Sequence, residues 1–159
     1  MVSEDQLQEI AVRCFVLELA GTRLLLPNTL IAEVTECVDV KGAGNSPGWL
    51  NGIISWRGRN VPLIVFEEIL GGESPGRHDQ TRMVVMNTLN NNPRIPFIAM
   101  EIQALPRLIL LKHEMLEYDE NNKIDAPVVY ATLHLDGESM IVPNVDKIEN
   151  MLESLGITA

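Results

Sequence analysis

Apolar and polar residues alternate along most of the chain, in short runs separated by glycine, proline and asparagine. A period of two is typical of strands, whose side chains point to opposite sides in turn. The pattern predicts nine or ten strands, which in chain order cover residues 13–19, 22–26, 31–40, 52–56, 61–66, 82–88, 95–101, 105–111, 128–135 and 138–142. Short strands at this spacing predict a mainly β protein, either a single barrel or a pair of small barrels.

Turn and helix signals complete the predicted order. Arg57-Gly58-Arg59-Asn60 predicts a tight turn, and Asp136-Gly137 is the strongest hairpin signal in the chain. Asn144 is a good helix N-cap, and apolar residues then recur at helical spacing to Leu155. The polar residues 71–80 predict a hinge between two lobes of one domain. We therefore expect a leader at 1–12, a domain at 13–155 and a tail at 156–159.

Composition narrows the class of protein. The chain has 159 residues, of which 46% are hydrophobic and only 4% aromatic, so one domain with an aliphatic core is expected. The formal charge of −10 disfavours binding to nucleic acid or to anionic membranes, and the only dense basic stretch is Arg57-Gly58-Arg59. No apolar run approaches about 18 residues, so no membrane insertion is expected. Cys14 and Cys37 are expected to be free thiols of a cytoplasmic protein.

Three weak motifs for catalysis or metal binding have simpler explanations. Residues 72–76 match GxSxG, but Pro75 and the flanking glycines prevent the strand-to-helix turn that a nucleophile needs. The glycine-rich residues 42–48 contain Pro47 and predict a surface loop. His134 and Glu138 lie on either side of a turn, which separates them onto different strands. We predict no catalytic residue, no cofactor and no metal ligand, which disfavours an enzyme without excluding one.

Two opposite charges are more informative. Glu33 and Arg57 each lie in or beside an apolar strand, where a lone half-buried charge is costly. They can pair with one another, in a forked contact if the geometry allows it. They can also be two unrelated surface charges, and the pattern alone leaves both readings open.

The order of motifs resembles the CheW-like family, the coupling proteins of bacterial chemosensory systems. The stretches that carry the resemblance in the first half are Phe15-Val16-Leu17, Leu25-Leu26-Pro27, Ile31-Ala32-Glu33-Val34, Ser46-Pro47-Gly48-Trp49-Leu50-Asn51-Gly52-Ile53-Ile54 and Arg57-Gly58-Arg59-Asn60-Val61-Pro62-Leu63-Ile64. Weaker matches in the second half are Pro96-Phe97-Ile98-Ala99-Met100-Glu101 and Leu135-Asp136-Gly137-Glu138-Ser139-Met140-Ile141-Val142-Pro143. Together they cover about residues 13 to 153.

The resemblance implies a fold and a set of partners. The fold would be two intertwined five-stranded SH3-like β-barrels with a C-terminal helix. The function would be that of a non-enzymatic adaptor, which couples the cytoplasmic hairpin tips of chemoreceptors to the regulatory domain of a CheA-type histidine kinase. Receptor helices would enter an apolar groove between the lobes, and the kinase would contact exposed barrel ends. By position, the residues that match family positions linked to fold integrity and partner binding are Ile31, Glu33, Gly52, Arg57 and Gly58.

Two departures from the family pattern are present. Val65 stands where an acidic residue is common, and Trp56 stands where an aliphatic residue is common. Both favour a divergent branch, such as one that serves a pilus-motility (twitching) system. We expect a mostly monomeric cytoplasmic protein that is recruited to membrane-associated receptor arrays. The alternatives are a small β-barrel ligand-binding protein or enzyme with a dispersed site, and a stand-alone domain that binds proteins outside chemotaxis.

Overall fold

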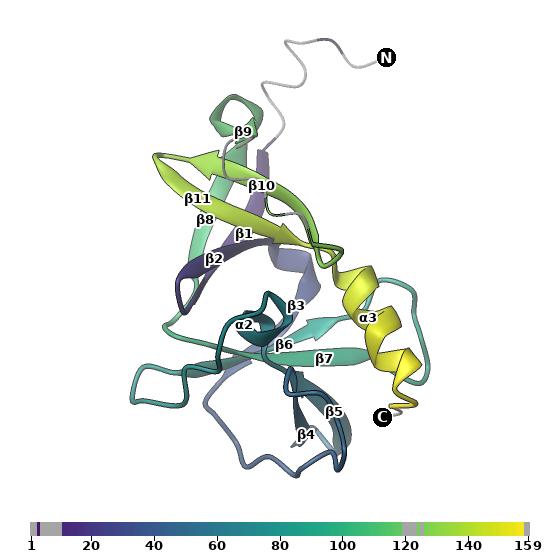
Figure 1. The fold of residues 1–159 in the computed structure, drawn as a ribbon. Helices are drawn as coiled ribbons and strands as arrows, with labels where there is room; N and C mark the ends of the chain where they lie inside the picture. Colours follow the sequence, from purple (N-terminus) through teal and green to yellow (C-terminus); the bar gives the residue numbers. More distant parts are fainter. Residues whose placement is uncertain (1–2, 4–10, 119–123, 125, 158–159) are drawn as a thin grey trace.

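The computed structural model describes residues 3, 11–118, 124 and 126–157 (Figure 1). Two antiparallel-rich sheets and a C-terminal helix make up the described chain, so the mainly β prediction is confirmed. The expected leader at 1–12 and tail at 156–159 fall largely outside the described residues. In the described part of the chain, no helix is long and apolar enough to cross a bilayer.

The first sheet combines strands from the two ends of the chain. It has the order β8-β1-β2-β11-β10-β9. The bounds are β1 (Ala11–Leu19), β2 (Thr22–Pro27), β8 (Arg107–Lys112), β9 (Glu117–Tyr118), β10 (Val129–Leu135) and β11 (Glu138–Pro143). Ile141 of β11 pairs in parallel with Leu24 of β2, which closes the gap between the early and the late strands.

The second sheet comes from the middle of the chain. It has the order β3-β6-β7-β5-β4. The bounds are β3 (Ile31–Thr35), β4 (Leu50–Trp56), β5 (Arg59–Ile64), β6 (Arg82–Asn87) and β7 (Phe97–Ile102). The chain passes from the first sheet to the second through the short 3-10 helix η1 (Asn28–Leu30) and returns through residues 103–106. Each sheet with its helices is called a lobe below.

The helices are short and lie at the ends of strands. Helix α2 (Phe66–Ile69) follows β5, the 3-10 helix η2 (His113–Met115) follows β8, and α3 (Val145–Ser154) follows β11. The Asn144 side chain accepts a hydrogen bond from the Lys147 backbone, as the predicted N-cap requires. Figure 1 shows α3 running from the end of β11 alongside the second sheet.

The largest core cluster joins the two lobes. It includes Leu17 and Leu24 of the first sheet, Val84 and Met100 of the second sheet, and Ile148 of α3. Two smaller clusters lie within the first sheet around Val16 and Met140 and within the second sheet around Ile54 and Leu63. Because the main cluster is shared, the lobes are expected to fold as one unit.

The structure differs from the predicted elements in three places. The strand predicted over 31–40 ends at Thr35, and Lys41 then makes an isolated bridge with Ile53. The first sheet has six strands instead of five, because the two-residue β9 pairs with β10. Residues 71–80 connect α2 to β6 within the second lobe, whereas the chain changes sheets at 28–30 and 103–106. Closure of each sheet into a barrel and hinge motion at 71–80 stay predictions.

Candidate protein-binding surfaces

The tip of the β4–β5 hairpin brings Glu33 and Arg57 together. The Trp56 indole Nε1 donates a 2.5 Å hydrogen bond to Oε2 of Glu33. One terminal nitrogen of Arg57 lies 3.6 Å from the other carboxylate oxygen, Oε1. The Arg57 guanidinium also lies 4.9 Å from the centroid of the Trp56 ring. Trp56, which the sequence marked as a departure from the family pattern, therefore contacts both charged groups.

The contact of Arg57 with Glu33 is weaker than a forked ion pair. A forked contact consists of two hydrogen bonds, whereas the Arg57–Glu33 contact measures 3.6 Å, which is longer than a hydrogen bond. The Arg57 side chain is 66% exposed and that of Glu33 is 36% exposed. An ion pair this accessible to water contributes about 0–1 kcal/mol to stability. The forked contact considered from the sequence is therefore wrong, and the pair is a surface feature.

A second arginine extends this contact into an array. The rings of Trp56 and Phe97 pack edge to face, with centroids 4.8 Å apart and an interplanar angle of 64°. The Arg59 guanidinium lies 5.8 Å from the centroid of the Phe97 ring. We call these four side chains, Arg57, Trp56, Phe97 and Arg59, the arginine–aromatic array. Strands β4, β5 and β7 contribute to it together with the hairpin turn.

Of the two glycines singled out from the sequence, Gly52 and Gly58, only Gly52 is required because another backbone segment lies close to it. A Cβ atom on Gly52 would lie 2.1 Å from the backbone oxygen of Lys41. That oxygen accepts a hydrogen bond from Ile53, and the Lys41 backbone N–H donates to the Ile53 oxygen. Gly58 has open space around it and a φ of +74°, which suits the hairpin turn. Gly52 thus has a structural role, whereas Gly58 sets the conformation of the turn.

Ile31 lies where the chain enters the second sheet. It pairs with Met86 of β6, is half-buried and packs against the main core cluster. The neighbouring Leu30 borders a groove of about 440 Å³ between the lobes, which we call the inter-lobe groove. Its other lining residues are Leu26, Pro27, Leu89, Tyr130, Val142, Pro143, Asn144, Val145 and Asp146. Ile31 is not among them, so it lies beside the groove and not in its wall.

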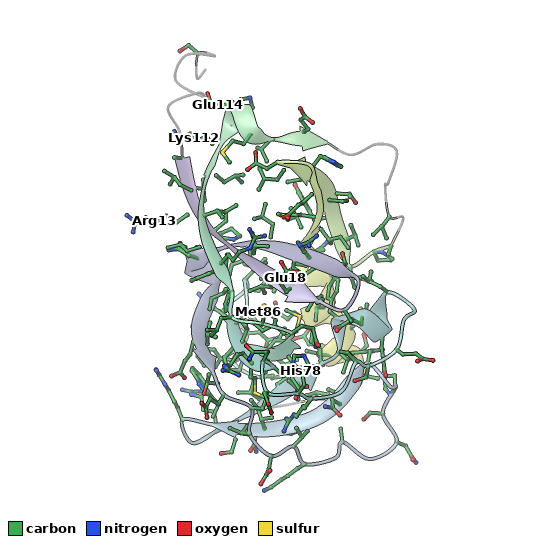
Figure 2. All side chains as sticks on the ribbon, turned by 90° about the vertical axis from the view of Figure 1, so that its left-hand side faces the viewer. Arg13, Glu18, His78, Met86, Lys112 and Glu114 are labelled. Atoms are coloured by element: carbon green, nitrogen blue, oxygen red, sulfur yellow. The ribbon has the colours of Figure 1, made fainter. Side chains whose placement is uncertain are left out.

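The outer face of β8 exposes apolar side chains. Leu108 and Leu110 are 57% and 49% exposed, and Leu105, which precedes the strand, is 62% exposed. Leu108 pairs with Phe15 of β1 and Leu110 pairs with Arg13, so these four residues share one side of the sheet. In Figure 2 the Arg13 side chain projects sideways, away from β1 and β8. We call Leu108, Leu110 and the half-buried Phe15 the leucine face.

The titratable groups that are buried lie elsewhere. Glu67 of α2 is buried, and burial raises the pKa of its carboxyl, while hydrogen bonds from its own backbone and from Ala20 oppose that rise. Burial also raises the pKa of the thiols of Cys14 and Cys37. In the described part of the chain, no group of three or more His, Cys, Asp or Glu side chains is arranged to hold a metal ion. His134 faces Ser139 across the β10–β11 hairpin, and Glu138 faces Leu135.

Comparison with known proteins identifies the family. The model of the CheW-like domain matches residues 13–153. This chain belongs to the CheW-like family. Its structure is also similar to the crystal structure of the scaffolding protein TtCheW from Thermoanaerobacter tengcongensis, with a TM-score of 0.72, 20% sequence identity and 86% of each chain covered. No protein of curated function matches the sequence.

The residues that the CheW-like resemblance singled out lie at or behind the β4–β5 hairpin, and none of them lies on the leucine face. Glu33, Arg57 and Gly58 meet at the β4–β5 hairpin, whereas Gly52 and Ile31 belong to the packing behind it. The partners of that hairpin, Phe97 and Arg59, were not singled out from the sequence. Nor were the leucines at positions 105, 108 and 110, because an apolar strand predicts burial unless its place in the sheet is known. The sequence feature that could have indicated an exposed edge strand is the basic residue at each end of β8, since charged residues are common at sheet edges.

Proposed function

We propose that this CheW-like protein is a non-enzymatic chemosensory adaptor that couples chemoreceptor cytoplasmic tips to a CheA-type histidine kinase. The observation that carries the proposal is the match to the CheW-like domain over residues 13–153. The similar fold of TtCheW, which is described as a scaffolding protein, supports it. An adaptor acts by holding partners in a fixed geometry, so it needs separate exposed surfaces rather than a catalytic site.

The leucine face is the surface that we assign to the receptor hairpin. A contiguous set of exposed apolar side chains is typical of an interaction site. The face also borders the junction of the lobes, because Phe15 packs against the main core cluster and the next residue on the same side of β1, Leu17, lies inside it. Arg13 and Lys112 share this side of the sheet and would favour acidic residues on the receptor helices. Apolar anchors with charged flanks suit the apolar side of an amphipathic receptor helix.

The end of the second lobe is the surface that we assign to the kinase. The β4–β5 hairpin lies at the lower end of the molecule in Figure 1, away from β8. A receptor hairpin on the leucine face would leave that end accessible. Both partners could then bind one copy at the same time, as coupling demands. The free protein is expected to be mostly monomeric and cytoplasmic, and to join membrane-associated arrays through these two surfaces.

Co-sedimentation tests the proposal. The full chain is mixed with a chemoreceptor signalling fragment and its CheA-type kinase, and the pelleted fraction of each protein is measured. We expect the chain to pellet with the receptor fragment and to increase the pelleted kinase. A chain that stays in the supernatant with both partners would contradict the adaptor function.

Variants assign the receptor surface. Leu108→Glu and Leu110→Glu are expected to reduce co-sedimentation with the receptor fragment, because each places a carboxylate in the apolar contact. Leu155→Glu, on an exposed leucine after α3, is the matched control and is expected to behave as the unmodified chain. Leu89→Glu probes the inter-lobe groove. If only Leu89→Glu reduced binding, the groove and not the leucine face would receive the receptor.

A further inference from the structure

We propose that the arginine–aromatic array is a docking site for an acidic, carboxylate-bearing segment of a partner protein. The inference rests on the proposed function only in taking the partner to be a protein. It adds the chemistry of recognition at the hairpin end, and it names Arg59 and Phe97 as the residues that select the partner.

The charges at this end are available for an outside group. The chain carries a net charge of −10, and Arg23, Arg77 and Arg107 each have a carboxylate oxygen within 3.2 Å. Arg59 has no carboxylate within 4.0 Å among the described residues, and Arg57 has only the 3.6 Å contact with Glu33. These two guanidiniums therefore lack the close partners that those three arginines have.

Stacking on the rings prepares both guanidiniums for a carboxylate. The N–H groups of a guanidinium lie in the plane of the group. When the group lies over an aromatic face, these N–H groups stay free at its rim and can donate to two carboxylate oxygens. The rings are themselves fixed, because Trp56 donates to Glu33 and packs against Phe97. Less side-chain freedom is then lost when a carboxylate binds.

The backbone of the turn indicates that the Arg57 side chain has a role beyond the fold. Arg57 and Gly58 both have positive φ, +46° and +74°, as a two-residue type I′ turn requires. The β10–β11 hairpin has the same pair of conformations, with Asp136 at +50° and Gly137 at +80°. Asparagine and aspartate tolerate the first position better than arginine does. The chain thus uses the favourable residue in one hairpin and keeps arginine in the other.

A hollow beside Phe97 gives the site depth. It measures about 330 Å³ and includes Phe97 in its wall. The remaining lining residues are Asn87, Thr88, Asn91, Asn92, Pro93 and Pro96. A segment that crosses the array can place a side chain in this hollow, whose amides donate and accept hydrogen bonds. The combination of charge and a neighbouring concave surface favours a peptide segment over a free ion.

Fluorescence of Trp56 provides the test. The chain has two tryptophans, so Trp49→Phe makes Trp56 the only reporter. The probes are an acetylated and amidated Glu-Asp-Gly-Glu-Asp peptide and its neutral Gln-Asn-Gly-Gln-Asn counterpart. We expect a saturable change in emission with the acidic peptide only, which weakens as salt is added. Arg59→Gln is expected to lower the affinity about tenfold. Arg13→Gln, at an exposed arginine of the first sheet for which no ring contact is found among the described residues, is the matched control.

Arg57→Asn separates binding from folding. Because asparagine suits the turn, we expect an unchanged or higher Tm together with weaker binding of the acidic peptide. A lower Tm with unchanged affinity would give Arg57 a purely structural role and overturn the proposal. An equal response to the neutral peptide, or an unchanged affinity in Arg59→Gln, would also overturn it. So would tighter binding of inorganic tripolyphosphate in competition with the peptide, since that indicates a general anion site. None of these outcomes affects co-sedimentation with the receptor, which tests the adaptor function separately.

Discussion

Strands β7 and β8 are alike in sequence and opposite in environment. Both have six residues and both are mostly apolar. β7 lies between β6 and β5, and Ile98, Ala99, Met100 and Ile102 are all buried. β8 lies at the edge of the first sheet, and none of its residues is fully buried. Similar apolar content therefore does not distinguish the buried strand from the exposed one.

The difference in environment between β7 and β8 shows that an edge strand can present apolar side chains to a partner. An exposed apolar edge strand invites unwanted pairing, and charged residues at its ends reduce that hazard. Arg107 and Lys112 stand at the two ends of β8. The β4 edge of the second sheet is protected differently, because residues 40–41 lie against β4 through the Lys41–Ile53 bridge. The β8 edge, by contrast, carries the leucine face.

The largest effect is expected from equal truncations in the two strands. Ile98→Ala in β7 removes a fully buried side chain from between two neighbours and is expected to lower the free energy of unfolding by about 2–5 kcal/mol. Leu108→Ala in β8 is expected to change it by about 0.5 kcal/mol or less. Urea unfolding measures both. Similar losses in the two variants would show that β8 is covered in solution and would remove the contrast between the strands.

Gly52→Ala tests the covered edge of the second sheet. The new Cβ would meet the backbone oxygen of Lys41, so the bridge to Ile53 must shift. We expect a loss of about 1–3 kcal/mol in the free energy of unfolding, as in other overpacked sites. Gly58→Ala is the comparison, because its cost arises from positive φ alone and is about 1–2 kcal/mol. Faster amide exchange at Ile53 in Gly52→Ala, but not in Gly58→Ala, would locate the damage at the covered edge.

Glu67→Gln examines the junction between the lobes, where a buried acid replaces apolar packing. The raised pKa means that the folded state holds the proton more tightly than the unfolded state, whose glutamate pKa is about 4.3. The contribution of Glu67 to stability is therefore most favourable below that value and is lost as the pH rises through the raised pKa. We expect Glu67→Gln to lose less stability than the unmodified chain between pH 4 and pH 8.

The control for Glu67 is an exposed acid. Glu117→Gln removes the same charge from β9 at the surface. It is expected to follow the pH dependence of the unmodified chain. Identical pH profiles for Glu67→Gln and the unmodified chain would show that Glu67 is hydrated at the junction.

The smallest effect is expected at the hairpin end. A double-mutant cycle of Glu33→Ala and Arg57→Ala is expected to give a coupling energy of about 0–1 kcal/mol, because both side chains are accessible to water. The measurement is thermal or urea unfolding of the two single variants and the double variant. A coupling energy of about 3 kcal/mol or more would mean that the pair is desolvated, contrary to its exposure here.

Much of the fold could be predicted from local pattern. The Asp136-Gly137 hairpin, the Asn144 cap and the strand limits within a few residues all follow from turn chemistry and periodicity. The short β9 and the early end of β3 could not be predicted, because each depends on a partner elsewhere in the chain: Leu133 and His134 for β9, and the Lys41–Ile53 bridge for the segment after β3. The approach of Glu33 to Arg57 was a hypothesis from the sequence, yet its geometry depends on Trp56, whose position the pattern does not specify.

The sequence by itself determined the class of fold, the family and the identity of the turn residues, since these depend on short-range periodicity and on ordered motifs. Only the tertiary structure decided which apolar strand is buried and which is exposed, because burial depends on the neighbours that a strand acquires in the sheet. It also decided that Arg59 lies over Phe97, since these residues are distant in the chain and adjacent only after β5 pairs with β7. Surfaces for partners arise from such long-range pairing, and for that reason they are the last features that a sequence reveals.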